Sequence, residues 1–289
     1  MKRMLSAIMM MSLLIAMPIM AFADAAEGDV LVTLGANLTP KQKEDLLAEM
    51  KVDVNSAQVV EVTNEEEHKY LGSYLPKAQI GTRAISSAKI TIGAKNSGIE
   101  VESKNINYVS DEMYMNALTT AGVKDASVYV TAPFTVSGTG ALTGLIKAYE
   151  KASGEKIPEE QKQVANEEMV ATAELGEKVG QEKAGELVTL IKDKLAETNP
   201  KNDEERKALV EEAAKQINIT LTDQDINLFA SLIEKWQNLD INWNAVGDQL
   251  TKAKEKWDAF AESEEGKNFF QKLGDFLKAI VDAIASWFK

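Results

Sequence analysis

The 289-residue chain contains no cysteine. Disulfide bonds, thiolate nucleophiles, lipid attachment at a lipobox cysteine and cysteine-based zinc sites are therefore all excluded. Histidine is almost as scarce, because His68 is its single occurrence. This excludes a metal site built from several histidines and any mechanism that needs two of them. We therefore expect a packed core to hold the fold together, and we expect no metal and no cofactor.

Basic residues are also in short supply. The chain has 32 lysines and arginines against 45 aspartates and glutamates, a formal net charge of −13. Nucleic-acid binding depends on basic side chains that neutralise phosphates, so no nucleic-acid partner is expected. An acidic surface keeps a protein soluble. Acidic runs such as Glu65–Glu67 and Glu167-Glu168 are accordingly interpreted as solvated helix faces.

Residues 1–23 have the three parts of a cleavable secretory signal peptide. Lys2 and Arg3 supply the positive start, and an apolar run extends from Met4 to Met20. Ala21-Phe22-Ala23 then gives the small-x-small pattern at which a signal peptidase cleaves. Cleavage is favoured over retention as a membrane anchor, which would need about 20 uninterrupted apolar residues. We expect an exported mature chain that begins at Asp24.

Short β-rich runs recur through residues 24–152. Five of them predict strands, at Val30–Leu34, Gln58–Val62, Ser87–Ala94, Ile99–Ile106 and Ser127–Thr131. The third and fourth runs are joined across Lys95-Asn96-Ser97-Gly98, which is typical of a β-hairpin.

Capping residues place the helices of the same region. Thr39 with Gln42, and Thr63 with Glu66, have the spacing of capping boxes, and Ser110 caps a third helix. From residue 57 on, the order is strand, helix, strand, strand, helix, strand. This order matches the split βαβ arrangement of ferredoxin-like folds. We therefore predict an α+β protein whose N-terminal domain is mixed α/β.

Aromatic residues divide the chain into two parts. All six tyrosines lie between Tyr70 and Tyr149, whereas all four tryptophans lie between Trp236 and Trp287. We place a domain boundary near Ser153 on this basis, so that residues 24–152 form one domain.

Helical patterns dominate residues 153–289. Apolar residues recur at helical spacing, and Asn202 and Thr222 are candidate caps. The stretch Gln161–Gly185 contains interior glycines, each of which costs about 1 kcal/mol relative to alanine. We predict an all-α C-terminal domain in which this stretch is helical but loosely packed.

Several stretches resemble a known family. They are Thr33-Leu34-Gly35 with Leu38-Thr39, Ala117–Gly122, Ala132–Gly138, and Ala141–Gly144 leading into Lys147–Glu150. Together they resemble the YpuA-like family of secreted bacterial proteins, whose function is unknown. The resemblance implies an extracytoplasmic, cell-envelope-associated role. It carries no catalytic or ligand residue, because none is established for the family.

The sharpest candidate site is a glycine-rich turn between a strand and a helix. It consists of Ser137, Gly138, Thr139 and Gly140, with Thr143 in the helix that follows. Free N–H groups at a helix start can hold an anion or another polar ligand. The turn lacks the full spacing of a dinucleotide-binding loop and the lysine of a P-loop. A simple strand-to-helix turn stays open as the alternative.

Residues 267–289 predict an amphipathic helix at the C-terminus. Its apolar stripe contains Phe269, Phe270, Leu273, Phe276, Leu277, Ile280, Ile284, Trp287 and Phe288. Such a helix can lie in a membrane interface or fill a groove of a protein partner. It can equally pack on its own domain, as amphipathic helices usually do.

Three hypotheses of function remain. The first is an exported, non-catalytic, envelope-associated protein that binds a cell-envelope component or a protein partner. The second is an extracellular carboxylate-dependent hydrolase of cell-wall glycans, which would need two facing acids. The third is peripheral membrane or partner contact through the C-terminal helix.

Overall fold

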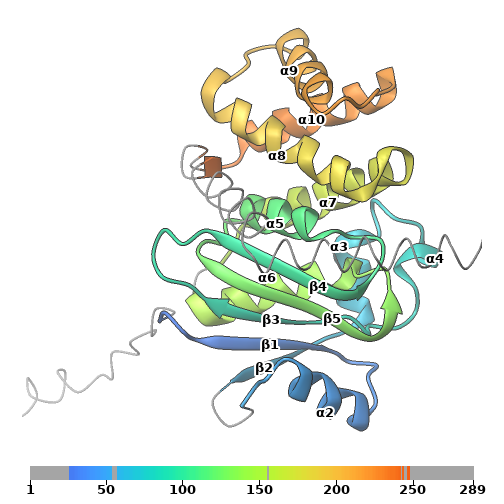
Figure 1. Cartoon of the computed structure of the whole chain (residues 1–289), viewed down its shortest axis with the longest axis vertical. Coiled ribbons are helices and arrows are strands. Elements are labelled where there is room, and N and C mark those ends of the chain that lie inside the picture. The colour runs from blue at the N-terminus through green and yellow to red at the C-terminus, as the bar shows by residue number, and fades with distance from the viewer. Residues whose placement is uncertain (1–25, 54–56, 155, 242, 244–245, 248–289) are drawn as a thin grey trace, which may run out of the picture.

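The computed structural model describes residues 26–53, 57–154, 156–241, 243, 246 and 247. In chain order the elements are β1 (Val30–Gly35), α2 (Pro40–Glu49), β2 (Gln58–Val62), α3 (Asn64–Leu71), α4 (Lys77–Ile80), β3 (Ser87–Ile92), β4 (Ile99–Ile106), α5 (Asp111–Thr120), β5 (Ala126–Val136), α6 (Thr139–Ser153), α7 (Glu159–Val179), α8 (Gln181–Thr198), α9 (Asp203–Gln216) and α10 (Asp223–Asn238). The N-terminal part carries a mixed five-stranded sheet and the part after α6 is helical as far as described, which confirms the α+β class (Figure 1).

Five helices begin at the caps expected from the sequence. Thr39, Thr63, Ser110, Asn202 and Thr222 each accept a hydrogen bond from the backbone N–H three residues on. Such a bond satisfies one of the donors that the first helical turn leaves unpaired. These five predictions are confirmed, and so are the predicted bounds of β2 and β4.

The strands lie in the order β2-β1-β3-β5-β4. β1 and β2 are parallel, as are β4 and β5, whereas β3 runs antiparallel to both β1 and β5. The predicted hairpin between β3 and β4 is therefore wrong, because β5 lies between them. The strand order also differs from the ferredoxin-like arrangement. Asn96 and Gly98 do adopt the positive φ values of a tight turn, but the turn joins strands that are not neighbours.

Burial explains why β5 separates the two strands. From Val128 to Ala132 its residues are buried or half-buried, whereas Glu100 and Glu102 of β4 are exposed. A strand buried on both faces belongs inside a sheet, and exposed charges suit an edge. The parallel pair β4–β5 is closed by the crossover helix α5, which packs against β4.

Alternate strand residues contribute to two separate cores, because successive side chains point to opposite faces of a sheet. Leu31, Ile90 and Val130 belong to a large cluster that includes residues of α5 and α6. Val32 and Ala132 belong to a smaller cluster with residues of α2. The large cluster continues into α7, α8, α9 and α10, which Figure 1 shows stacked on the side of α5 away from α2.

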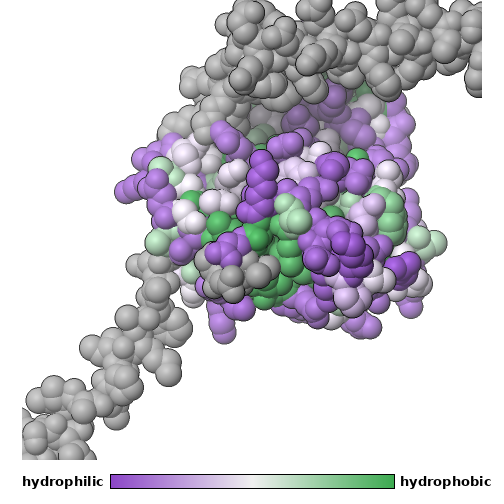
Figure 2. Space-filling model, turned by 60° about the horizontal axis from the view of Figure 1, so that its bottom comes forward, coloured by the Kyte–Doolittle hydropathy of each residue, from purple (hydrophilic) through white to green (hydrophobic). Residues whose placement is uncertain are grey.

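The face covered by α2 keeps apolar surface. Figure 2, turned so that the α2 side comes forward, shows apolar surface between hydrophilic groups there. The half-buried apolar side chains that pack against the smaller cluster are Val30, Leu47, Val52, Ala57, Ile106, Tyr129 and Val136. The short helix α2 covers less of the sheet than the several helices on the opposite face do. These side chains therefore stay partly exposed at the edge of the smaller core.

The helical part joins the sheet part through a continuous core. A single cluster contains Val130 of the sheet, Leu118 of α5, Val170 of α7 and Trp236 of α10. The division into two domains near Ser153 stays a prediction.

The stretch Gln161–Gly185 is closely packed, so the prediction of loose packing is wrong. A Cβ on Gly185 would lie 2.7 Å from the Cβ of Glu112, so glycine lets α8 approach α5 closely. Twelve of the residues in α7 are buried as well.

Candidate functional site

The glycine-rich turn connects the end of β5 to the start of α6. Gly138 has a φ of 86° and precedes the helix as its N-cap. A Cβ on Gly138 would overlap the hydroxyl of Tyr114 and a methyl group of Ile106. The same hydroxyl donates a hydrogen bond of 2.6 Å to the carbonyl oxygen of Gly138. Both the conformation and the space therefore require glycine at this position.

A carboxylate of the protein itself faces the start of α6. A Cβ on Gly140 would overlap the Oε1 atom of Glu67, so this carboxyl group lies directly over the first helical turn. The positive end of a helix dipole favours such a group. The space over the start of α6 is therefore occupied by a carboxyl group of the chain itself, and the binding of an anion or another polar ligand at this turn stays a prediction.

Glu67 is buried, with 4% of its surface exposed. The side chain of Asn64 donates a hydrogen bond of 3.0 Å to its Oε2 atom. Burial raises the pKa of Glu67 to about 7. The hydrogen bond from Asn64 lowers the pKa, but its effect is smaller than that of burial. The interpretation of Glu65–Glu67 as a solvated face is wrong for this residue, because this side of α3 packs against α6.

These groups line one pocket, here called the turn pocket, with a volume of about 270 Å³. Its wall contains Ser137, Gly138, Thr139 and Gly140, together with Glu67, Arg83 and Phe134. Arg83 is exposed, and Phe134 is 47% exposed. Four of the five predicted site residues thus line this pocket, beside three residues that the sequence did not mark as site residues.

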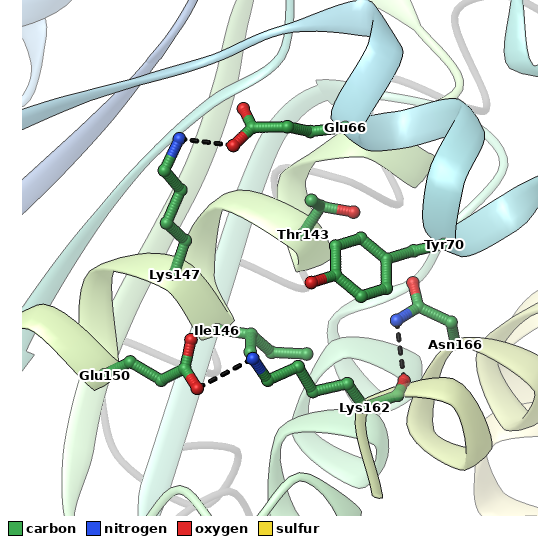
Figure 3. Close-up of a pocket in the computed structure, with 8 residues that line it drawn as sticks. All are labelled: Glu66, Tyr70, Thr143, Ile146, Lys147, Glu150, Lys162 and Asn166. Carbon is green, nitrogen blue, oxygen red and sulfur yellow. Dashed lines mark hydrogen bonds and ion pairs between the residues drawn. The ribbon is translucent and has the colours of Figure 1, made fainter. Parts of the chain in front are cut away.

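Thr143, the fifth predicted residue, lines a different pocket. This second pocket, here called the ion-pair pocket, has a volume of about 130 Å³ and lies between α3, α6 and α7 (Figure 3). Its lining consists of Glu66, Tyr70, Thr143, Ile146, Lys147, Glu150, Lys162 and Asn166. Glu66 and Glu67 are neighbours in the chain, yet each lines a different pocket.

Two ion pairs border the ion-pair pocket. Lys147 Nζ lies 2.5 Å from Glu66 Oε1, and Lys162 Nζ lies 2.7 Å from Glu150 Oε1. In Figure 3 the hydroxyl of Tyr70 points to the space between the two pairs. Burial is the largest single influence on the pKa of Glu66 and would raise it, but the hydrogen bonds from Lys147 and from the backbone of Thr63, together with the charges of Lys147 and Lys69, outweigh burial, and the pKa is lowered. This carboxylate is held ionised and is unsuited to act as an acid.

Two buried polar atoms at this pocket make no hydrogen bond to the protein. They are the hydroxyl oxygen of Thr143 and the side-chain oxygen of Asn166, in residues that are 3% and 1% exposed. The amide nitrogen of Asn166 donates a hydrogen bond of 2.8 Å to the carbonyl oxygen of Lys162, which fixes the orientation of the amide. Buried polar atoms without partners are rare in proteins and call for a specific explanation.

His68, the potential metal ligands and the lengths of the helices can be checked for the described residues. His68 Nε2 lies 2.9 Å from the carbonyl oxygen of Gly81, so the one histidine has a structural contact. No cluster of three or more potential metal ligands occurs among the residues that the structure describes. Within those same residues, no helix has the length and apolarity to cross a membrane. The signal peptide and the helix at 267–289 lie outside the described residues.

Comparison with known proteins gives a family and no activity. A family model described as "Protein of unknown function (DUF1002)" matches residues 34–253. The chain is also 56% identical over 278 residues to "Uncharacterized protein YpuA" of Bacillus subtilis (strain 168), which covers 96% of each chain. These matches confirm the resemblance noted in the sequence. No solved structure matches the chain.

Proposed function

We propose a function for this chain, which belongs to the DUF1002 family of proteins of unknown function, from its turn pocket. The protein is an exported, envelope-associated binding protein that holds a polar envelope component, a glycan, in this pocket without converting it. The observation that carries the proposal is the pocket itself. The end of β5 with Phe134 and the glycine-rich turn meet Glu67 and Arg83 there, which come from separate parts of the chain.

The lining suits hydroxyl groups better than a simple anion. Glu67 accepts hydrogen bonds and repels anions when it is ionised, while Arg83 donates hydrogen bonds from a planar group. The exposed ring of Phe134 offers a flat apolar face to the ring of a sugar. A pocket with an apolar wall and a few convergent polar groups is the usual form of a small-molecule site.

The geometry favours binding over hydrolysis. Glycoside hydrolysis needs two carboxyl groups about 5 to 9 Å apart across the bond that is cleaved. Among the described residues that line the turn pocket, Glu67 is the one carboxyl group. The two carboxylates of the ion-pair pocket are each held by a lysine. This leaves neither pocket with a free pair of acids.

Export rests on the N-terminal sequence. Lys2, Arg3, the apolar run and Ala21-Phe22-Ala23 support cleavage before Asp24. The mass of the protein recovered from culture medium or from the cell wall checks this, with a chain that begins at Asp24 expected. A full-length chain found inside the cell would contradict it.

The binding experiment uses the mature chain, residues 24–289, and a β-1,4-linked tetramer of N-acetylglucosamine as probe. Calorimetric titration is expected to show binding that Phe134→Ala weakens by about 10-fold, because the stacking face is lost. Val59→Ala is the matched control, since Val59 is an exposed apolar residue of the edge strand β2, and it should leave the affinity unchanged.

Two outcomes would overturn the proposal. One is the absence of any binding of the tetramer. The other is conversion of the tetramer to shorter products, with loss of that activity in Glu67→Gln, which would establish the hydrolase instead.

A further inference from the structure

We propose that the ion-pair pocket is a second binding site, and that it takes a small, uncharged molecule rich in hydroxyl groups, about the size of one sugar ring. The proposal does not rest on the turn pocket. It stands on two features of the pocket, namely a balanced set of charges and two buried polar atoms without partners.

The charged side chains of the pocket neutralise one another, so the pocket does not need a charged ligand. Its two lysines and two glutamates sum to zero, and each lysine is bonded to a carboxylate. Glu150 Oε1 also accepts a hydrogen bond of 2.9 Å from the backbone N–H of Ile157. A charged ligand would compete with one of these pairs and leave a lysine or a glutamate without its partner. A neutral ligand breaks neither.

The atoms that lack partners define the chemistry of the ligand. The free oxygen of Asn166 accepts and cannot donate, so a ligand must bring a donor to it. The hydroxyl of Thr143 both donates and accepts. A ligand hydroxyl group can satisfy either atom, because it too donates and accepts. The ring of Tyr70 supplies a wall against which the carbon skeleton of a sugar can lie (Figure 3).

The size of the pocket limits the ligand to one ring. Its volume is about 130 Å³, close to the roughly 150 Å³ of an engineered cavity that holds benzene. A six-membered ring can enter, with its outer substituents at the mouth. A chain of sugars cannot, which separates this site from the larger turn pocket.

The experiment titrates the mature chain with glucose and with myo-inositol while backbone amide shifts are followed by NMR. Shifts are expected around Thr143 and Asn166. Thr143→Val should weaken binding about 5- to 10-fold, because one hydrogen bond to the ligand is lost, and Thr143→Ser should restore it. The melting temperature should not fall in Thr143→Val, since the hydroxyl bonds to nothing in the protein.

Thr119→Val is the matched control. The hydroxyl of Thr119 donates a hydrogen bond of 2.7 Å to the carbonyl oxygen of Met115, and the residue lies outside both pockets. This variant should lower the melting temperature and leave sugar binding unchanged.

Three results would overturn the proposal. The first is binding of glycine or inorganic phosphate in place of the two neutral probes. The second is shifts confined to the turn pocket around Gly138 and Gly140. The third is no binding of any probe, which would show that ordered water alone satisfies Thr143 and Asn166. The tetramer experiment can fail while glucose binds here, so the two proposals fail independently.

Discussion

Two lysine–glutamate clusters in this protein have opposite characters. In the first, Lys192 lies 2.6 Å from Glu168, and the two side chains are 0% and 1% exposed. Thr120 donates a hydrogen bond of 2.5 Å to the other oxygen of Glu168, and Lys192 donates one of 2.6 Å to the carbonyl oxygen of Asn116. Lys192 Nζ also lies 5.3 Å from the ring centroid of Trp236.

The second cluster is the ion-pair pocket. Its lysines are paired as well, but the hydroxyl of Thr143 and the side-chain oxygen of Asn166 beside them lack hydrogen-bond partners, and a pocket opens between α3, α6 and α7. The buried network of Lys192, Glu168, Thr120 and Asn116, in which both charged groups are hydrogen-bonded, holds α5, α7 and α8 together. An incomplete one around a pocket offers hydrogen bonds to a ligand. The difference lies in which atoms are satisfied, not in which residues are present.

The largest expected effect is from breaking the buried pair. Lys192→Met leaves the charge of Glu168 buried without a cation, which is expected to lower the free energy of unfolding by about 3 to 5 kcal/mol. Urea denaturation followed by circular dichroism measures this. Lys207, whose side chain is 37% exposed and pairs with Asp203, gives the control Lys207→Met, for which no measurable loss of stability is expected, because solvent screens such a surface pair. Equal losses in the two variants would show that burial gives the Lys192–Glu168 pair no more importance for stability than a surface pair has.

The second largest effect on stability is expected at Glu67, a buried carboxyl group with no lysine beside it in the turn pocket. Its pKa of about 7 lies above the ordinary value of 4.5, so the folded state binds the proton more tightly than the unfolded state. Its contribution to stability is complete below about pH 4.5 and is lost as the pH rises through 7. The loss amounts to about 3 kcal/mol.

Denaturation curves collected from pH 4 to pH 8 measure this effect. Glu67→Gln should flatten the decline of stability over that range and raise the stability at pH 8. Some decline should remain, because burial raises the pKa of Asp111 to about 6 as well. An unchanged profile in Glu67→Gln would show that this carboxyl group is ionised across the whole range.

The smallest expected effect is at the ion-pair pocket. Lys162→Met removes a pair whose side chains are 11% and 22% exposed, and Glu150 keeps its bond from the N–H of Ile157 and its access to solvent. A loss of about 1 kcal/mol is expected. The same urea titration measures it. A loss as large as that of Lys192→Met would mean that this cluster too is mainly structural.

The glycine-rich turn shows how far the sequence leads toward the site. Glycines between a strand and a helix identify Ser137–Gly140 as a candidate, and these residues do line a pocket. Glu67 and Arg83 were missed because they come from other segments of the chain, and only packing brings them to the turn, whereas Phe134 lies in β5 just before the turn and was missed because the glycine pattern does not include it. Thr143 was grouped with the turn, yet one helical turn further on it faces the other pocket.

Local signals determined the elements of this protein. Capping oxygens at Thr39, Thr63 and Ser110 act on donors three residues away, so the helix starts can be read directly from the sequence. The turn at Asn96 and Gly98 is equally local, and its conformation is as expected.

Tertiary structure alone decided which strands pair and which charges are buried. A turn reverses the direction of the chain but does not determine which strands pair in the sheet. β5 lies between β3 and β4 because its residues need burial on both faces. Likewise, Glu67 and Glu168 each follow another glutamate in the chain, and nothing local distinguishes these buried residues from their half-buried neighbours Glu66 and Glu167. These two glutamates are buried because helices more than twenty residues apart in the sequence pack against each other. The same packing forms the structural network around Glu168 and the candidate site around Glu67.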